Sequence, residues 1–100
     1  IDWTKSAAEI ERFIRALNPF IGAISMFYGT IVRFNSAKII KQNHKHKPGT
    51  IINTNKTIQI ACGIDVLEME CIQYGGFFIG TAKDFIERVG PKKGEFFTNE

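Results

Sequence analysis

Few residues of this 100-residue chain have the types and spacing that catalysis requires. His44 and His46 are its two histidines, and a His-x-His pair can bind a metal ion. Lysines interleave and flank the pair, and no third ligand lies nearby, which favours solvent-exposed loop histidines. Cys62 precedes a glycine, but it ends an apolar run and has no base beside it. The sequence therefore predicts no catalytic residue and no metal site.

The two cysteines, Cys62 and Cys71, have a spacing that matches no zinc or redox motif. They could form one disulfide. Nothing else in the chain is typical of a secreted protein, so buried free thiols in a reducing cytoplasm are favoured. The sequence also lacks a glycine-rich phosphate loop and a Ser/His/Asp arrangement.

The charge is unevenly distributed along the chain. Lysine and arginine number 13 against 10 acids, a net charge of +3. Residues 12–64 contain eight basic residues and no acid, whereas both flanking segments are net negative. This pattern predicts one positive face, as in proteins that bind polyanions. The alternative is a lysine-rich surface with no partner.

Aromatic side chains are a second candidate feature, because bases of nucleic acids stack on them. In a chain with nine phenylalanines most aromatic rings must be core. The candidates for exposure are Tyr28, Tyr74 and the pair Phe77-Phe78. The full set considered is Trp3, Phe20, Tyr28, Phe34, Tyr74, Phe77 and Phe78.

A helix begins near Ser6, because Ser6-x-x-Glu9 has the spacing of a capping box. The helix ends at residues 18–19, Asn-Pro, because a residue before proline avoids helical geometry. Its apolar stripe is expected to pack against the rest of the fold, with Phe13 in the middle. The stripe consists of Ile10, Phe13, Ile14 and Leu17.

The pattern then changes to strands. A tight turn at Tyr28-Gly29 and an exposed basic loop at 42–49 separate the first of them. The predicted strands are 24–27, 31–40 with a bend near 35–36, 50–52, 58–62 and 66–72.

In the last of these strands, Leu67, Met69 and Cys71 are expected to share one face. A short second helix follows over residues 81–89, and a tail at 94–97 adds a strand or packs its rings. About five strands and two short helices predict a mainly β fold. The expected architecture is a small closed antiparallel barrel of the OB-fold type.

The length indicates one domain, and no apolar run approaches the roughly 20 residues of a membrane helix. The opening, Ile1-Asp2-Trp3, has neither a signal peptide nor a methionine. We expect a cytoplasmic domain, residues 1–100, cut from a longer chain.

Several segments together resemble the C-terminal domain of the methionyl-tRNA formyltransferase family. Residues 1–3 and 14–23 are similar to its opening, Ile-Asp-Trp, Ile-Arg and Asn-Pro-Trp-Pro-Gly-Ala. Residues 48–51 match its Pro-Gly-Thr-Ile. Residues 60–63 with Leu67 resemble Val-Ala-Cys-Gly-Asp-Gly-x-Leu, and Gln73 with residues 82–85 resembles its late Gln and Ala-x-Asp-Phe.

The resemblance implies a noncatalytic OB-like domain that follows a Rossmann-type catalytic domain. The parent enzyme would transfer a formyl group from 10-formyltetrahydrofolate, its co-substrate, and this fragment would hold no cofactor. A positive surface of the C-terminal domain would hold the acceptor arm of initiator methionyl-tRNA. The phosphate contacts would be Arg33, Lys38, Lys41, Lys45, Lys47 and Lys56.

Two other interpretations stay open. Residues 75–78 read Gly-Gly-Phe-Phe where the tRNA enzymes commonly have a basic segment. The chain is therefore also compatible with the structural or dimerising C-terminal domain of a nucleotide-sugar N-formyltransferase. The third interpretation is a free-standing OB module for single-stranded nucleic acid.

Overall fold

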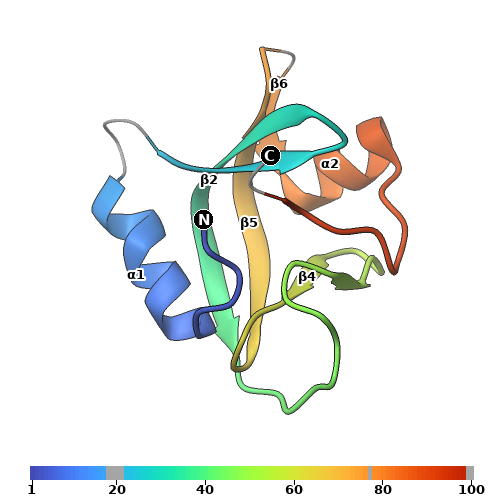
Figure 1. The fold of residues 1–100 in the computed structure, drawn as a ribbon. Helices are drawn as coiled ribbons and strands as arrows, with labels where there is room; N and C mark the ends of the chain where they lie inside the picture. The colour runs from blue at the N-terminus through green and yellow to red at the C-terminus, as the bar shows by residue number, and fades with distance from the viewer. Residues whose placement is uncertain (18–21, 77, 99–100) are drawn as a thin grey trace.

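A computed structural model describes residues 1–17, 22–76 and 78–98 (Figure 1). The predicted helix stop at 18–19 and the candidate stacking residues Phe20 and Phe77 lie outside the described residues. In chain order the elements are α1 (Ala7–Leu17), β1 (Ala23–Phe27), β2 (Thr30–Ile40), β3 (Ile51–Asn53), β4 (Ile58–Ala61), β5 (Val66–Tyr74), β6 (Phe78–Thr81) and α2 (Ala82–Val89).

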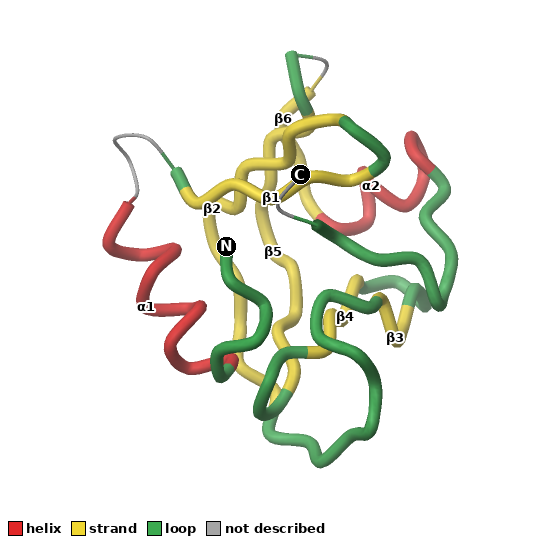
Figure 2. The backbone as a smooth tube through the Cα atoms, viewed as in Figure 1, coloured by secondary structure: helices red, strands yellow, loops and turns green. Residues whose placement is uncertain are grey.

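The strands form one curled antiparallel sheet. Its order is β1-β2-β5-β4-β3, and β6 pairs with residues 71–74 of β5. The helices α1 and α2 lie on opposite sides of β5 in the view of Figure 2. The predicted mainly β, antiparallel, OB-like fold with two short helices is confirmed. Strand β6 was not predicted, because Gly75-Gly76 indicates the end of β5 but not a returning strand.

The sheet is closed by the C-terminal tail. Among the described strands, β1 and β3 do not pair with each other. Instead, the tail exchanges two backbone hydrogen bonds with Met26 of β1, through Thr98, at 2.7 and 2.9 Å. It also bonds to Ile51 of β3 at 2.7 and 2.8 Å, through Glu95 and Gly94. Residues 94–98 therefore form a strap across both sheet edges.

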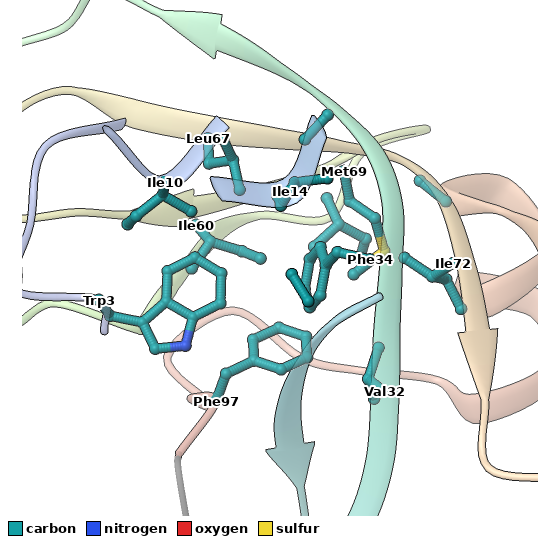
Figure 3. Close-up of a cluster of buried hydrophobic side chains, with 14 of the residues drawn as sticks. Trp3, Ile10, Ile14, Val32, Phe34, Ile60, Leu67, Met69, Ile72 and Phe97 are labelled. Carbon is teal, nitrogen blue, oxygen red and sulfur yellow. The ribbon is translucent and has the colours of Figure 1, made fainter. Parts of the chain in front are cut away.

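The core is rich in aromatic rings (Figure 3). Phe97 of the strap lies 5.8 Å from Trp3 and 5.6 Å from Phe34, between ring centroids. Phe27 lies 5.1 Å from the same ring. The strap is thus held by the packing of Phe97 as well as by backbone hydrogen bonds, and the described tail forms isolated bridges and not a further strand.

The first helix is capped as predicted but packs differently. The backbone N–H and hydroxyl of Ser6 donate to the Glu9 carboxylate, and the Glu9 N–H donates back to Ser6. Ile10 and Ile14 are buried. Phe13, expected in the same stripe, is 46% exposed, so its expected packing against the barrel is wrong.

Strand β5 does not keep one alternation throughout. Leu67 and Met69 are buried as predicted, but Cys71 is exposed and Ile72 is buried. The register between β2 and β5 shifts on both sides of Ser36, which pairs with Cys71. Such an irregularity inserts an extra residue and moves the later side chains to the opposite face. The predictions that Cys71 shares the Met69 face and is buried are therefore wrong.

Candidate nucleic-acid interface

The basic loop at residues 41–49 follows β2 and lies at the lower end of the sheet in Figure 2. Two contacts to one residue anchor it. The Gln42 N–H donates to a carboxylate oxygen of Asp65 at 3.1 Å, and His44 Nε2 lies 3.1 Å from the Asp65 carbonyl oxygen. Asp65, with a φ of 64°, belongs to the turn between β4 and β5. The turn therefore fixes the start of the loop.

His44 is a structural residue of this loop. A carbonyl oxygen only accepts hydrogen bonds, so His44 Nε2 carries the proton that is donated to Asp65. The other nitrogen, Nδ1, accepts from the His46 N–H at 3.1 Å. The two rings stack with centroids 5.9 Å apart. Both nitrogens of His44 are thus engaged with protein groups.

Three lysines project from the anchored loop. Lys41, Lys45 and Lys47 are all exposed. Within the described parts of the chain, no ion pair is seen for any of them. They are three cations on one short segment whose first half is held in place by Asp65. An exposed ammonium group of this kind is a point charge suited to contact with a phosphate.

Lys38 has different surroundings. It pairs in register with Glu68, and its Nζ lies 3.8 Å from a carboxylate oxygen of Glu70. A hydrogen-bonded row continues across the sheet, in which Gln59 donates to Glu68 at 3.2 Å and Asn53 donates to Gln59 at 3.4 Å. Strand β5 lies between β2 and β4, which both belong to the acid-free segment, and it brings Glu68 and Glu70 beside Lys38. The positive charge of Lys38 is therefore partly compensated.

The two remaining basic residues lie apart from the loop along the chain. Arg33 is half-buried on β2, where its side chain lies near Gly22. Lys56 is exposed in the turn between β3 and β4, with a φ of 66°. Lys41, Lys45 and Lys47 thus belong to one loop, whereas Lys38 and Arg33 lie on β2 and Lys56 lies in another turn.

A polar hollow of about 260 Å³ lies at the base of the loop. Its lining includes Gln42 and His44 from the loop and Ile64 and Asp65 from the facing turn. Sequence reasoning did not single out Asp65. The only available signal was that it is the first acid after the long acid-free segment.

The aromatic candidates are mostly core. Trp3 and Phe34 are buried, and Tyr74 is half-buried against the same core. Phe78 is half-buried, and the Arg88 guanidinium lies 5.2 Å from its ring centroid. Tyr28 is 74% exposed at the hairpin tip, where its hydroxyl donates to Glu95. Of the candidates in the described residues, Tyr28 alone offers a broadly open ring.

The side chain considered as a nucleophile is poorly suited to that role. Cys62 is fully buried, and this burial raises the pKa of its thiol to about 12. At neutral pH the reactive thiolate is therefore almost absent. Cys62 and Cys71 are both free thiols, so the alternative of a disulfide between them is wrong.

Within residues 1–17, 22–76 and 78–98, no three His, Cys, Asp or Glu side chains gather where they would hold a metal ion. Neither helix in these ranges is long and apolar enough to cross a membrane.

Residues 1–90 match the sequence profile of the family described as formyl transferase, C-terminal domain. The chain is 42% identical over 77 residues to the methionyl-tRNA formyltransferase of Clostridium novyi (strain NT), covering 76% of this chain and 25% of that protein. It is 34% identical over 98 residues to the enzyme of that name from Nitrosomonas eutropha (strain DSM 101675 / C91 / Nm57), covering 97% and 31%.

A third relative is the methionyl-tRNA formyltransferase of Coxiella burnetii (strain RSA 331 / Henzerling II). It is 37% identical over 93 residues, which are 92% of this chain and 30% of that protein. The chain thus spans between a quarter and a third of the length of these relatives. Together with the OB-like fold, the profile match shows that this chain belongs to the family of formyl transferase C-terminal domains.

Proposed function

We propose that this chain is the noncatalytic C-terminal domain of a methionyl-tRNA formyltransferase. It would hold the acceptor arm of initiator methionyl-tRNA by its phosphates. A Rossmann-type catalytic domain ahead of it in the same chain would transfer the formyl group from 10-formyltetrahydrofolate, in the cytoplasm. Three relatives from different genera carry the methionyl-tRNA name, which supports this substrate over an amino sugar.

The observation that carries the proposal is the anchored basic loop. Lys41, Lys45 and Lys47 are exposed, and the contacts to Asp65 restrict the segment that presents them. A preordered cationic loop loses less conformational entropy on binding than a free one. It can therefore position a nucleic-acid backbone without reading bases.

The other basic residues contribute to different extents. Lys56 is exposed and would reach a phosphate beside the main contact area. Lys38 would contribute less, because Glu70 already neutralises part of its charge at 3.8 Å. Arg33 is half-buried and would contribute only to a backbone that passes over β2.

The test uses the full-length enzyme and measures tRNA affinity over a range of salt concentrations. Each phosphate contact contributes a slope of roughly 0.7–0.9 in the logarithmic plot. Neutralising Lys41, Lys45 and Lys47 to glutamine should therefore reduce the slope by about two to three, and should weaken all tRNAs alike.

The matched control neutralises three exposed lysines outside the acid-free segment, Lys83, Lys92 and Lys93. It removes the same net charge and should leave the slope nearly unchanged. If both variants lose the same tRNA affinity and slope, the effect depends on net charge alone, which would contradict the proposed interface. Absence of tRNA binding at low salt, with unchanged behaviour of the loop variant, would favour the amino-sugar enzyme.

A further inference from the structure

An apolar groove lies between the N-terminal segment and helix α1. In the view of Figure 2, α1 lies on the opposite side of β5 from α2. The volume of the groove is about 440 Å³, within the range of roughly 300–1,000 Å³ typical of binding sites. The apolar part of its lining is Ile1, Ile10, Phe13 and Ala16. The groove shares no lining residue with the basic loop.

Phe13 explains why the groove is apolar. The helix uses Ile10 and Ile14 to cover the barrel, and these side chains are 2% and 0% exposed. Phe13 and Ala16 form a second apolar strip on the flank of the helix, where Phe13 remains 46% exposed. Together with Ile1 and Ile10, these side chains line one groove, and a gathered apolar surface of this kind is typical of an interaction site, whereas a single exposed ring is not.

The charges at the rim add a preference. Asp2 and Glu9 have hydrogen-bond partners within the domain, since Asp2 accepts from the Thr4 N–H at 3.0 Å and Glu9 accepts from Ser6 at 3.2 Å. Lys5 and Arg12 are exposed at the same rim. The rim thus carries two acids and two bases, and a segment with apolar side chains and no large net charge is complementary to this groove.

We propose that the groove is occupied by the polypeptide that leads from the catalytic domain into residue 1. This inference rests on the proposed function, in which most of the full-length chain precedes the C-terminal domain. The backbone nitrogen of Ile1 donates to the Ile24 carbonyl at 2.7 Å, which fixes the chain at the groove wall. Three or four preceding residues extend about 10–14 Å, enough to lie along α1. Their docking would set the orientation between the two domains.

The test measures the alkylation rate of one introduced cysteine at a time in the full-length enzyme without tRNA. Phe13→Cys and Ala16→Cys report on the groove, and both are made in a Cys71→Ser background because Cys71 is exposed. Ile79→Cys is the control, since Ile79 is 71% exposed on β6. Ala16→Cys is nearly isosteric, so it keeps the test valid if Phe13→Cys fails to fold.

A covered groove should make the reporter cysteines react at least about tenfold more slowly than Ile79→Cys, at every protein concentration. A smaller difference overturns the proposal. Protection that grows with protein concentration identifies a second copy of the chain, and protection that needs tRNA identifies the nucleic acid; either result also overturns it. The tRNA salt dependence tests the proposed function separately, so each can fail without the other.

Discussion

The indole nitrogen of Trp3 donates a hydrogen bond to the hydroxyl of Ser25 at 2.9 Å. That hydroxyl in turn donates to the Thr98 carbonyl oxygen at 2.8 Å. Ser25 is only 2% exposed, and its side chain joins the N-terminal segment, β1 and the strap in one chain of hydrogen bonds. A buried polar group is stable in an apolar core when its partners are present in this way.

Ser25→Ala should therefore destabilise the domain by about 1–3 kcal/mol, because the buried indole N–H loses its acceptor. Urea unfolding of the variant and the parent measures this difference. Ser36→Ala, on the neighbouring strand β2, controls for the change in strand propensity. Equal midpoints for Ser25→Ala and the parent would show that water replaces the hydroxyl.

Phe13→Ala should cost less than about 1 kcal/mol, whereas Ile14→Ala should cost about 2–5 kcal/mol. The two residues are neighbours on α1, but Phe13 is 46% exposed and Ile14 is fully buried. Thermal unfolding of this chain alone measures both values. Similar losses for the two variants would place Phe13 back in the barrel-facing stripe.

Gly63→Ala should destabilise the domain by about 3 kcal/mol or more, because its new Cβ would overlap backbone. The Cβ would lie 1.9 Å from the Thr4 carbonyl oxygen, and backbone there cannot rotate away as a side chain does. Gly76→Ala is the control, since a Cβ at that exposed position meets nothing within 4 Å. Equal unfolding midpoints would contradict this close approach.

Asp84 should make the stability of the domain depend on pH in the acidic range, through its cap on α2. Its pKa is lowered because the backbone N–H and hydroxyl of Thr81 donate to the carboxylate. Because the pKa of Asp84 is lower in the folded state, its carboxylate stabilises the fold at pH values above the ordinary pKa of 3.8. This contribution is lost as the pH falls through the lowered pKa. The parent should therefore lose more stability than Asp84→Asn between pH 5 and pH 2. Parallel losses would contradict this role of the cap, and Glu87→Gln on the same helix controls for general charge.

One thiol, and not two, should react with a disulfide reagent in the native protein. Cys71 is exposed, whereas Cys62 is buried and the pKa of its thiol is raised to about 12. Absorbance after addition of the reagent counts the reactive thiols, and denaturant should release the second. If Cys71→Ser shows no rapid reaction in the native state, the reactive thiol is Cys71. Rapid reaction of both thiols in the parent would contradict the assignment.

Local patterns in the sequence predicted local structure correctly. The Ser6-x-x-Glu9 spacing is a capping box in the structure, and Tyr28-Gly29 forms the hairpin turn with φ values of 48° and 77°. Thr81 caps α2 and Gly90 ends it in the left-handed conformation. Each of these features depends on residues within a few positions of one another, so one sequence contains the whole cause.

Features that depend on strand order could not be predicted. The acid-free segment does not produce an acid-free neighbourhood, because β5 lies between β2 and β4 and brings Glu68 and Glu70 beside Lys38. The exposure of Cys71 depends on a register shift opposite Ser36, and the amino-acid sequence of β5 by itself does not indicate that shift. Long-range pairing decides both outcomes.

The strap at residues 94–98 also has a consequence for synthesis on the ribosome. A nascent chain grows from its N-terminus, so β1 and β3 emerge long before the segment that joins them. Until residue 98 leaves the exit tunnel, both sheet edges keep unpaired backbone groups, and such edges invite pairing with other chains. We expect stalled chains to gain protease resistance abruptly once residues 94–98 have emerged. A gradual gain from β5 onward would show that the barrel is stable before it is closed.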